Sequence, residues 1–349
     1  MADDTYILVV RFSAMGDVAL TAPVAGAAET GTGKILFLTR SAFADFFINM
    51  DGVEVFKADL GGRHKGLTGI IRLFSDINRA YRIKCVIDLH SVLRSWIIGL
   101  LYRLKGIKVY SIDKGRRDKK NFIKYKKEIN LPHTTDRYRN VFRKAGFNIR
   151  SARIPSFNIS NKAKEEAAEI IRHNVPAGYT IVGISPFAKH RTKSWGIENV
   201  RELMQTIRSE YDVYFLLFGS REEVAGLISL ASSGKCYIVA GKHKLETELA
   251  IISRLEFMIS MDSANMHLAA LSGIRTVSIW GGTHPLTGWA PSGDQQHLVI
   301  GISMNDLDCR PCTIYGKGEC LRKDVKYKCL KDIKPEMVYT RMKQSGILA

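Results

Sequence analysis

The stretch Phe257–Pro285, FMISMDSANMHLAALSGIRTVSIWGGTHP, decides how we interpret the fold. An apolar run of strand length, Phe257–Met261, is followed by Asp262, Ser263 and a short segment of helical pattern, and a second apolar run covers Thr276–Trp280. This β-α-β pattern puts polar groups at the carboxyl ends of strands, where open α/β sheets bind ligands, and a helix start favours an anion such as phosphate. The alternative is a core helix that Asp262 merely caps.

Strand-length apolar runs and helical segments alternate along the chain in two series. The first series opens at Tyr6–Phe12 and the second at Thr180–Ser185, after a polar segment at residues 148–160. Regular alternation indicates parallel sheets with helices on both faces. We therefore expect an α/β protein with two Rossmann-like, doubly wound domains that face a central cleft. Their expected bounds are residues 1–155 and 156–330, and residues 331–349 are expected to form a helix that packs back toward the N-terminal domain.

Composition limits the class of protein. The chain has 349 residues, 46% of them hydrophobic, which is enough for two domain-sized cores. Its start is acidic where a secretion signal would be basic, and its longest apolar candidate, Trp96–Tyr102, is too short to span a bilayer, so we expect a cytoplasmic protein. The formal net charge of +18 predicts an anionic partner: nucleic acid, anionic lipid or a phosphorylated substrate.

Two loops of the second series follow strands and carry charged groups. Ser185 is followed by a group of basic residues, which could clamp a diphosphate: Lys189, His190, Arg191 and Lys193. Glu222 follows the next predicted strand and could accept hydrogen bonds from ribose hydroxyls. The alternative for the basic group is an ordinary solvated loop. The chain has no Walker sequence and no G-x-G-x-x-G after its first strand, which excludes a P-loop enzyme and an ordinary dehydrogenase.

Several motifs together resemble a known family. VVRFSAMGDVALTAPV at residues 9–24, DLHSVLRS at 88–95, TKSW at 192–195 and MDSANMHLAALSG at 261–273 are similar to motifs of glycosyltransferase family 9, the lipopolysaccharide heptosyltransferases. The resemblance covers nearly the whole chain. It implies a GT-B fold in which the N-terminal half binds the acceptor and the C-terminal half binds the nucleotide sugar. It also implies an inverting transfer that requires no metal.

The resemblance assigns residues by matching position. Asp17 takes the place of the catalytic carboxylate, with the N-cap of a helix at residues 18–28 as its alternative role, and Lys193 takes that of the phosphate-binding lysine. The donor and its nucleotide are expected to contact Met15, Gly16, Ser185, Arg191, Lys193, Glu222, Asp262, Ser263, Ala264 and His267. The acceptor is expected to contact Arg63, His90, Arg94, Arg116 and Arg117. Ser263 and Ala264 replace the Thr and Gly of the family's Asp-Thr-Gly-x-x-His motif, and a buried histidine of purely structural role is the alternative for His267.

Four cysteines near the C-terminus and a basic run in the middle of the chain lead to two further expectations. Cys309-x2-Cys312-x7-Cys320-x8-Cys329 favours reduced thiols that pack a loop, with a structural zinc site as the alternative. Residues 103–127 carry eleven Lys or Arg against two Asp, and this run is typical of loop and surface.

These residues also define the expected partners. The resemblance implies ADP-heptose as donor and an anionic lipooligosaccharide as acceptor. The basic run, with Arg63, His64 and Lys65, predicts a peripheral, salt-sensitive contact of a monomer with the inner face of the inner membrane, without nucleic acid. Two other functions stay open at this point: a non-catalytic sugar-nucleotide-binding protein and a basic nucleic-acid-binding protein.

Overall fold

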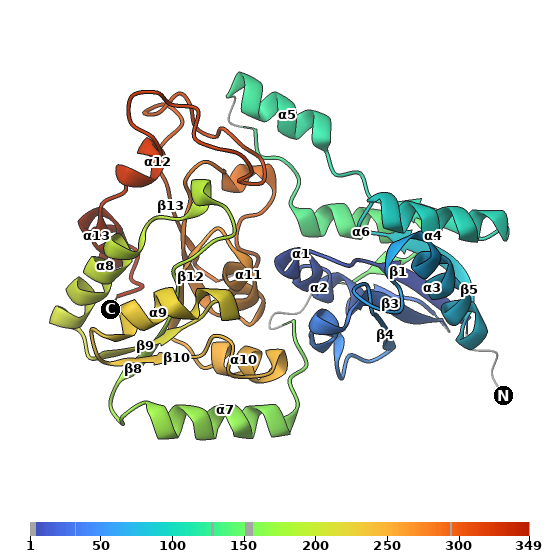
Figure 1. The fold of residues 1–349 in the computed structure, drawn as a ribbon, viewed down its shortest axis with the longest axis horizontal. Helices are drawn as coiled ribbons and strands as arrows, with labels where there is room; N and C mark the ends of the chain where they lie inside the picture. Colours follow the sequence, from blue (N-terminus) through green and yellow to red (C-terminus); the bar gives the residue numbers. More distant parts are fainter. Residues whose placement is uncertain (1–4, 32, 127–128, 151–155, 294, 349) are drawn as a thin grey trace. The chain divides into compact units, whose positions relative to one another are not determined.

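The computed structural model describes residues 5–31, 33–126, 129–150, 156–293 and 295–348. The chain divides into two compact units, one formed by Met1–Lys114 with Thr134–Ser160 and the other by Gly115–His133 with Asn161–Ala349 (Figure 1). The predicted domain boundary after residue 155 falls at residues 151–155, outside the described part of the chain.

The first unit contains a parallel sheet of order β4-β3-β1-β5-β6. Its strands are β1 (Thr5–Val10), β3 (Lys34–Arg40), β4 (Val53–Ala58), β5 (Arg82–Asp88) and β6 (Lys108–Ser111). A short antiparallel pair joins β2 (Ala28–Glu29) to β7 (Asn148–Ile149). Strand β1 is central, and its residues from Ile7 to Val10 are almost completely buried because helices cover both faces of the sheet. The loops after β1 and β5 therefore leave the sheet side by side.

The helices of the first unit are α1 (Met15–Ala19), α2 (Ala22–Ala25), η1 (Ser41–Phe47), α3 (Gly66–Ala80), α4 (Leu93–Leu104) and α6 (Thr134–Lys144). The predicted single helix over residues 18–28 is wrong in its bounds: it starts at Met15 and is broken into α1 and α2 near Thr21. Pro23 explains the break, because it has no N–H to donate and is tolerated only in the first turn of a new helix.

The second unit contains a parallel sheet of order β10-β9-β8-β11-β12-β13. Its strands are β8 (Thr180–Ser185), β9 (Val213–Leu217), β10 (Cys236–Ile238), β11 (Phe257–Met261), β12 (Arg275–Ile279) and β13 (Leu298–Ile300). Its helices are α5 (Arg116–Tyr125), α7 (Asn161–Asn174), η2 (Arg191–Lys193), α8 (Ile197–Glu210), η3 (Arg221–Glu223), α9 (Val224–Ala231), α10 (Leu245–Ile252), α11 (Ala264–Leu271), η4 (Pro285–Thr287), α12 (Lys328–Lys331) and α13 (Pro335–Gln344). Strands β8 and β11 are neighbours, and Ser260 pairs with Ser185 near their carboxyl ends.

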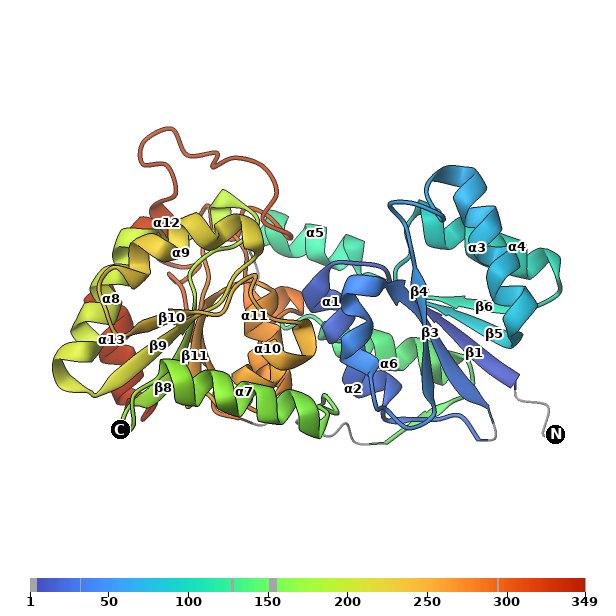
Figure 2. The same ribbon diagram turned by 60° about the horizontal axis from the view of Figure 1, so that its bottom comes forward.

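Two elements differ from the predicted organisation. Helix α13 packs against α8 of its own unit, not toward the N-terminal domain, because Val338 and Met342 complete the hydrophobic core of the second unit (Figure 2). Residues 116–125 form helix α5, not a loop, and belong to the second unit. Its buried residues, Lys119 and Phe122, give this charged segment an inner face.

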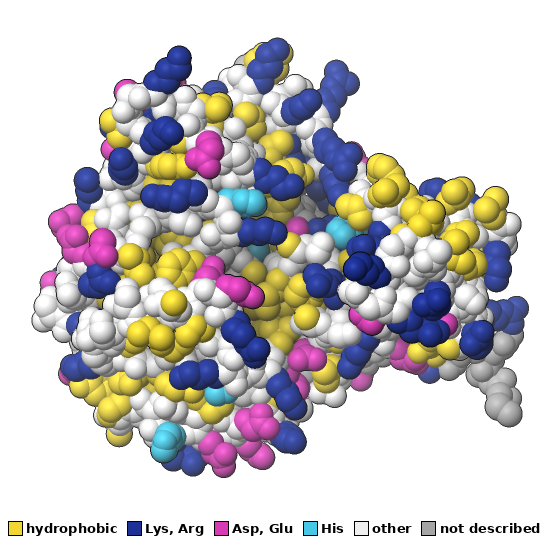
Figure 3. Space-filling model, in the orientation of Figure 1, with side chains coloured by type: hydrophobic (Ala, Val, Ile, Leu, Met, Phe, Trp, Pro, Cys, Tyr) yellow, Lys and Arg dark blue, Asp and Glu magenta, His cyan; other side chains and the backbone are white. Residues whose placement is uncertain are grey.

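The surface agrees with the basic composition. Lys and Arg side chains are distributed over much of the face in Figure 3, with fewer Asp and Glu side chains among them. Among the helices that the structure describes, none has both the length and the apolar character needed to cross a bilayer.

Candidate functional site

In the first unit, the predicted catalytic carboxylate follows β1. Asp17 lies in the first turn of α1, after Met15 and Gly16, and the N-cap of that helix is Ala14, so the alternative role of Asp17 as N-cap is wrong. The Arg11 guanidinium forms an ion pair with the Asp17 carboxylate, with 2.9 Å between Nη2 and Oδ2. The Asp17 side chain is 26% exposed, against 8% for Arg11. The carboxylate is therefore held in place and still accessible.

His90 lies beside this carboxylate, in the loop after β5. The carboxylate of the buried Asp88 accepts the His90 backbone N–H at 2.9 Å, and the Phe12 backbone N–H points to the Nδ1 atom of His90 at 3.4 Å. Burial, together with the charges of Arg11 and Lys114, lowers the pKa of His90 to about 3. The imidazole is therefore neutral at neutral pH, and its Nε2 atom lies 3.4 Å from the Ser13 hydroxyl.

Sequence reasoning missed a basic residue in this region, Arg137 on α6. Its side chain is 8% exposed, and its Nη1 donates to the Asp113 carbonyl at 3.4 Å. Its Nε and Nη2 atoms are buried without a hydrogen-bond partner among the described residues, and so is the Nε of Arg94. The next residue, Tyr138, donates its hydroxyl to the Asp17 carbonyl at 3.2 Å. Buried guanidinium donors without partners are suited to an anionic ligand.

The other predicted acceptor residues lie elsewhere. Arg63 follows β4, which is separated from β1 by β3, and its guanidinium makes two hydrogen bonds to Asp76, at 2.9 and 2.8 Å. His64 lies 3.2 Å from the same carboxylate, so these residues connect a loop to α3. Arg116 and Arg117 open α5, which belongs to the second unit. In the first unit, only His90 and Arg94 of the predicted acceptor residues share the loop and helix start after β5.

In the second unit, the sheet brings together residues that are distant in the sequence. The Lys193 ammonium lies 2.8 Å from the Asp262 carboxylate, and their side chains are 16% and 8% exposed. The Thr283 hydroxyl donates to the same carboxylate oxygen at 2.7 Å. The Asn265 amide donates to the Ser185 hydroxyl at 2.9 Å, which links the end of β8 to the first turn of α11. These contacts hold a cation at the carboxyl edge of the sheet.

The start of α11 lies at the same edge. Its N-cap is Ser263, whose side chain makes no capping hydrogen bond and lies 3.1 Å from the Ser260 hydroxyl instead. The N–H groups of the first turn, from Ala264 onward, therefore have no side-chain acceptor from the N-cap, and a helix start of this kind favours a phosphate. His267 is only 5% exposed and lies among the buried residues of α11.

Arg191 and Glu222 lie on loops around this edge. Arg191 opens η2, and its guanidinium stacks over the ring of Tyr327 at 4.7 Å from the ring centre. Glu222 follows β9, which is the neighbour of β8, and it is exposed. The next residue, Glu223, accepts the Ser220 N–H at 2.7 Å and so caps the turn. Hydrogen bonds from its own backbone N–H and from the Ser220 side chain lower the pKa of the Glu222 carboxyl, so Glu222 also takes part in this turn. Its contact with a ribose stays a prediction.

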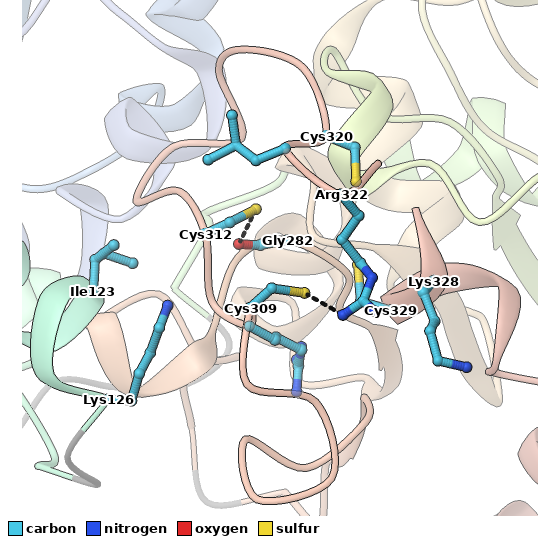
Figure 4. A pocket seen from close by; sticks show the side chains of 11 residues that line it. Ile123, Lys126, Gly282, Cys309, Cys312, Cys320, Arg322, Lys328 and Cys329 are labelled. Atoms are coloured by element: carbon cyan, nitrogen blue, oxygen red, sulfur yellow. Dashed lines mark hydrogen bonds between the residues drawn. The ribbon is translucent and has the colours of Figure 1, made fainter. Parts of the chain in front are cut away.

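The four cysteines of the C-terminal loop line one cavity of about 260 Å³. The sulfur atoms of the labelled cysteines lie around a common space in Figure 4, and the Tyr327 backbone N–H donates to the Cys320 sulfur at 3.1 Å. All six cysteines of the chain are free thiols. Over the described part of the chain, no group of three or more His, Cys, Asp or Glu side chains is arranged to hold a metal ion. The role of the thiols stays a prediction.

The cysteine-bearing loop also supports the carboxyl edge of the second sheet. The Thr192 hydroxyl donates to the Gly316 carbonyl at 2.6 Å, and the Cys312 N–H donates to the Gly282 carbonyl at 3.0 Å. Arg310 is 3% exposed, and its Nε donates to the Gly281 carbonyl at 2.7 Å. The loop thus fixes both the turn that carries Lys193 and the two glycines after β12.

The sequence of this chain matches one protein family and two curated proteins that carry the same name. Residues 71–317 match the family described as glycosyltransferase family 9 (heptosyltransferase). A protein of Campylobacter jejuni subsp. jejuni serotype O:2 named lipooligosaccharide heptosyltransferase 2 is 27% identical over 173 residues, which cover 48% of this chain and 51% of that protein. A protein of the same name from serotype O:6 is 26% identical over 174 residues, which cover 48% and 52%. The chain spans about half the length of the curated relatives it matches.

Solved structures of similar fold cover the whole chain. A glycosyl transferase family 9 protein from Veillonella parvula has a TM-score of 0.77 at 19% identity, covering 100% of this chain and 99% of that one. E. coli ADP-heptose lps heptosyltransferase II has a TM-score of 0.67 at 15% identity, covering 98% of both chains. E. coli heptosyltransferase WaaC with ADP has a TM-score of 0.66 at 17% identity, covering 98% and 100%. The predicted GT-B fold with two doubly wound domains is confirmed.

Proposed function

Because this chain belongs to glycosyltransferase family 9 (heptosyltransferase), we propose that it is an inverting glycosyltransferase acting on a lipooligosaccharide core acceptor. The proposed donor is ADP-heptose. Two solved structures of one protein of similar fold support this choice, since they are described as E. coli heptosyltransferase WaaC with ADP and with ADP-2-deoxy-2-fluoro heptose. The proposed place of action is the cytoplasmic face of the inner membrane, where a lipid-linked core is within reach of a nucleotide sugar.

The observation that carries the proposal is the Lys193–Asp262 pair beside the start of α11. A leaving nucleoside diphosphate gains negative charge as the glycosidic bond breaks, and it needs cations or N–H donors at that point. Lys193 supplies a cation, and the first turn of α11 supplies N–H groups. Asp262 and Thr283 fix the position of the lysine before the donor binds. With these groups, the proposed transfer requires no metal.

The proposed general base is Asp17. An inverting displacement needs a carboxylate that takes the proton of the acceptor hydroxyl while its oxygen attacks the anomeric carbon opposite the leaving group. Asp17 is accessible, and Arg11 fixes one of its oxygens. The buried guanidinium of Arg137 and the half-buried one of Arg94 would bind the anionic groups of the acceptor, and the neutral His90 would hydrogen-bond it.

The test is a transfer assay on Asp17→Asn with a truncated lipooligosaccharide acceptor. This change keeps the size of the side chain and removes its basicity, so turnover should fall by roughly 10²–10⁴-fold while donor affinity stays at the parent value. Asp51→Asn, at an exposed aspartate of the same unit, is the matched control and should leave turnover unchanged. The assignment is falsified if folded, donor-binding Asp17→Asn transfers sugar at the parent rate.

The donor is tested separately. Calorimetry with ADP, UDP, GDP and their sugars should give the tightest binding for the ADP compounds. Lys193→Met should weaken that binding, whereas Lys162→Met, at an exposed lysine on α7 of the same unit, should not. Tighter binding of UDP or GDP compounds would reject ADP-heptose as the donor. The proposed transferase activity would still be tested separately by Asp17→Asn.

A further inference from the structure

Helix α4 is apolar on two opposite faces. One face is buried in the core of the first unit through residues such as Tyr102, which has no exposed surface. The opposite face carries Leu93, Trp96, Leu100 and Leu104, which are 71%, 50%, 53% and 76% exposed. Their spacing of three, four and four residues puts them on one stripe of the helix. We call these four side chains the α4 stripe.

The α4 stripe has apolar neighbours. Helix α3 lies beside α4 and exposes Leu67 and Ile71 at 61% and 52% (Figure 2). Figure 3 shows hydrophobic side chains gathered over α4. Isolated exposed leucines are ordinary in proteins, but exposed apolar side chains gathered on two neighbouring helices mark an interaction site.

The charges around the α4 stripe identify the partner. No acidic residue occurs between Asp88 and Asp113, whereas Arg103, Lys105 and Lys108 are all exposed in this stretch. A second copy of the chain seated on the stripe would bring like charges together, which disfavours a dimer through this face. An anionic lipid surface offers both apolar chains and opposite charge.

Trp96 suits the same surface. Its indole N–H donates to the Ser91 hydroxyl at 3.1 Å, so the ring is held in one orientation with half of its surface exposed. Tryptophan is favoured at the boundary between headgroups and acyl chains because its ring is apolar and its N–H is polar.

We propose that the α4 stripe docks this protein on an anionic lipid bilayer, with its side chains inserted at the level of the headgroups. The inference deepens the proposed function, since a lipid-linked acceptor would be presented at that surface, but binding is measured without any transfer. It differs from the contact expected from the basic run alone, because apolar insertion adds a part of the binding that salt does not remove.

The experiment compares Leu100→Ser/Leu104→Ser with Ile228→Ser, an isoleucine 57% exposed on α9 of the second unit. Vesicles of phosphatidylethanolamine with phosphatidylglycerol are sedimented with each full-length protein, at low and high salt. The double variant should lose roughly 10- to 100-fold in partition constant, and the control should equal the parent. Parent binding should persist in part at high salt, and the fluorescence of the parent, but not of Trp96→Phe, should shift to the blue on vesicles.

Three results would overturn the proposal. The first is equal vesicle binding by the parent and the double variant, or no binding by either, with thermal unfolding showing that both are folded. The second is parent binding that high salt abolishes, which would leave only the basic residues. The third is a concentration-dependent dimer in sedimentation velocity that the double variant lacks. Transfer to a delipidated acceptor reports separately on the proposed function, and the double variant should retain it.

Discussion

The ion pair of Lys193 and Asp262 allows a quantitative test of the candidate site in the second unit. Its charged atoms lie 2.8 Å apart, and the two side chains are 16% and 8% exposed. At that distance the attraction is about 6 kcal/mol for an effective dielectric constant of about 20, before the cost of removing both charges from water. Lys193→Met keeps an apolar stem of similar length but leaves the buried carboxylate to the Thr283 hydroxyl.

We expect Lys193→Met to lower the free energy of unfolding of the second unit by about 3 kcal/mol, the lower end of the range for a broken buried pair, because Thr283 still donates to Asp262. Denaturant unfolding followed by tryptophan fluorescence measures this change. Trp195 and Trp280 are 3% and 1% exposed in the core of this unit, so their emission reports its unfolding.

A double-mutant cycle separates the pair from other effects. Lys193→Met/Asp262→Asn removes both charges, so its cost should be smaller than the sum of the two single changes by about 2 kcal/mol. Lys189→Met, in the same loop but exposed, should change stability by less than about 0.5 kcal/mol. Additive costs in the cycle, or a Lys193→Met midpoint equal to that of the parent, would refute the coupling of lysine and carboxylate.

Three further predictions concern other parts of the chain. Arg137→Met should raise the acceptor KM by roughly 10-fold or more and leave the donor Kd unchanged, because it removes buried hydrogen-bond donors. Arg143→Met, at an exposed arginine of the same helix, should leave the acceptor KM unchanged. Equal acceptor KM values for the two variants would contradict this prediction. Burial raises the pKa of Glu248 from 4.5 to about 7, so the stability that its proton contributes is complete below pH 4.5 and is lost as the pH rises through 7. Glu248→Gln should therefore be more stable than the parent at pH 8, by up to about 3 kcal/mol, and equal to it near pH 4 in thermal unfolding. Protein purified without chelator should contain no stoichiometric zinc; one equivalent, lost together with thermal stability when the four loop cysteines are replaced, would reverse our preference for reduced thiols.

The buried strands could be predicted from the sequence because they are uninterrupted apolar runs. Both Phe257–Met261 and Thr180–Ser185 have the predicted bounds in the structure. Strand β13 (Leu298–Ile300) was missed because, in the described part of the chain, only the short η4, and no α-helix, separates it from β12, so the alternation of strands and helices does not indicate it. Helix α5 was missed because its apolar periodicity is weak: of its buried residues, one is Phe122 and the other is a lysine.

The candidate site could be predicted in its parts but not in its contacts. Asp262 was identified because it directly follows a strand, and Lys193 because it lies in the loop after another strand. Their ion pair forms because β8 and β11 are neighbours in the sheet, which cannot be read from the order of the strands along the chain. Arg137 was missed because an arginine on a polar helix is typically solvated, and only the packing of α6 shows that this one is buried.

The basic run at residues 103–127 shows why charge counted along a sequence can mislead. The structure divides this run between the two units, with residues 103–114 in the first and 115–126 of the described part in the second. Arg103 and Lys105 lie at the end of α4, Lys108 opens β6, and all three are exposed. Lys119 is only 2% exposed, and its ammonium lies over the Trp289 ring at 3.6 Å from the ring centre, so its charge is used in packing. The proposed contact with lipid can therefore use only part of this charge, and we expect the exposed apolar side chains of the α4 stripe to supply the rest of the affinity.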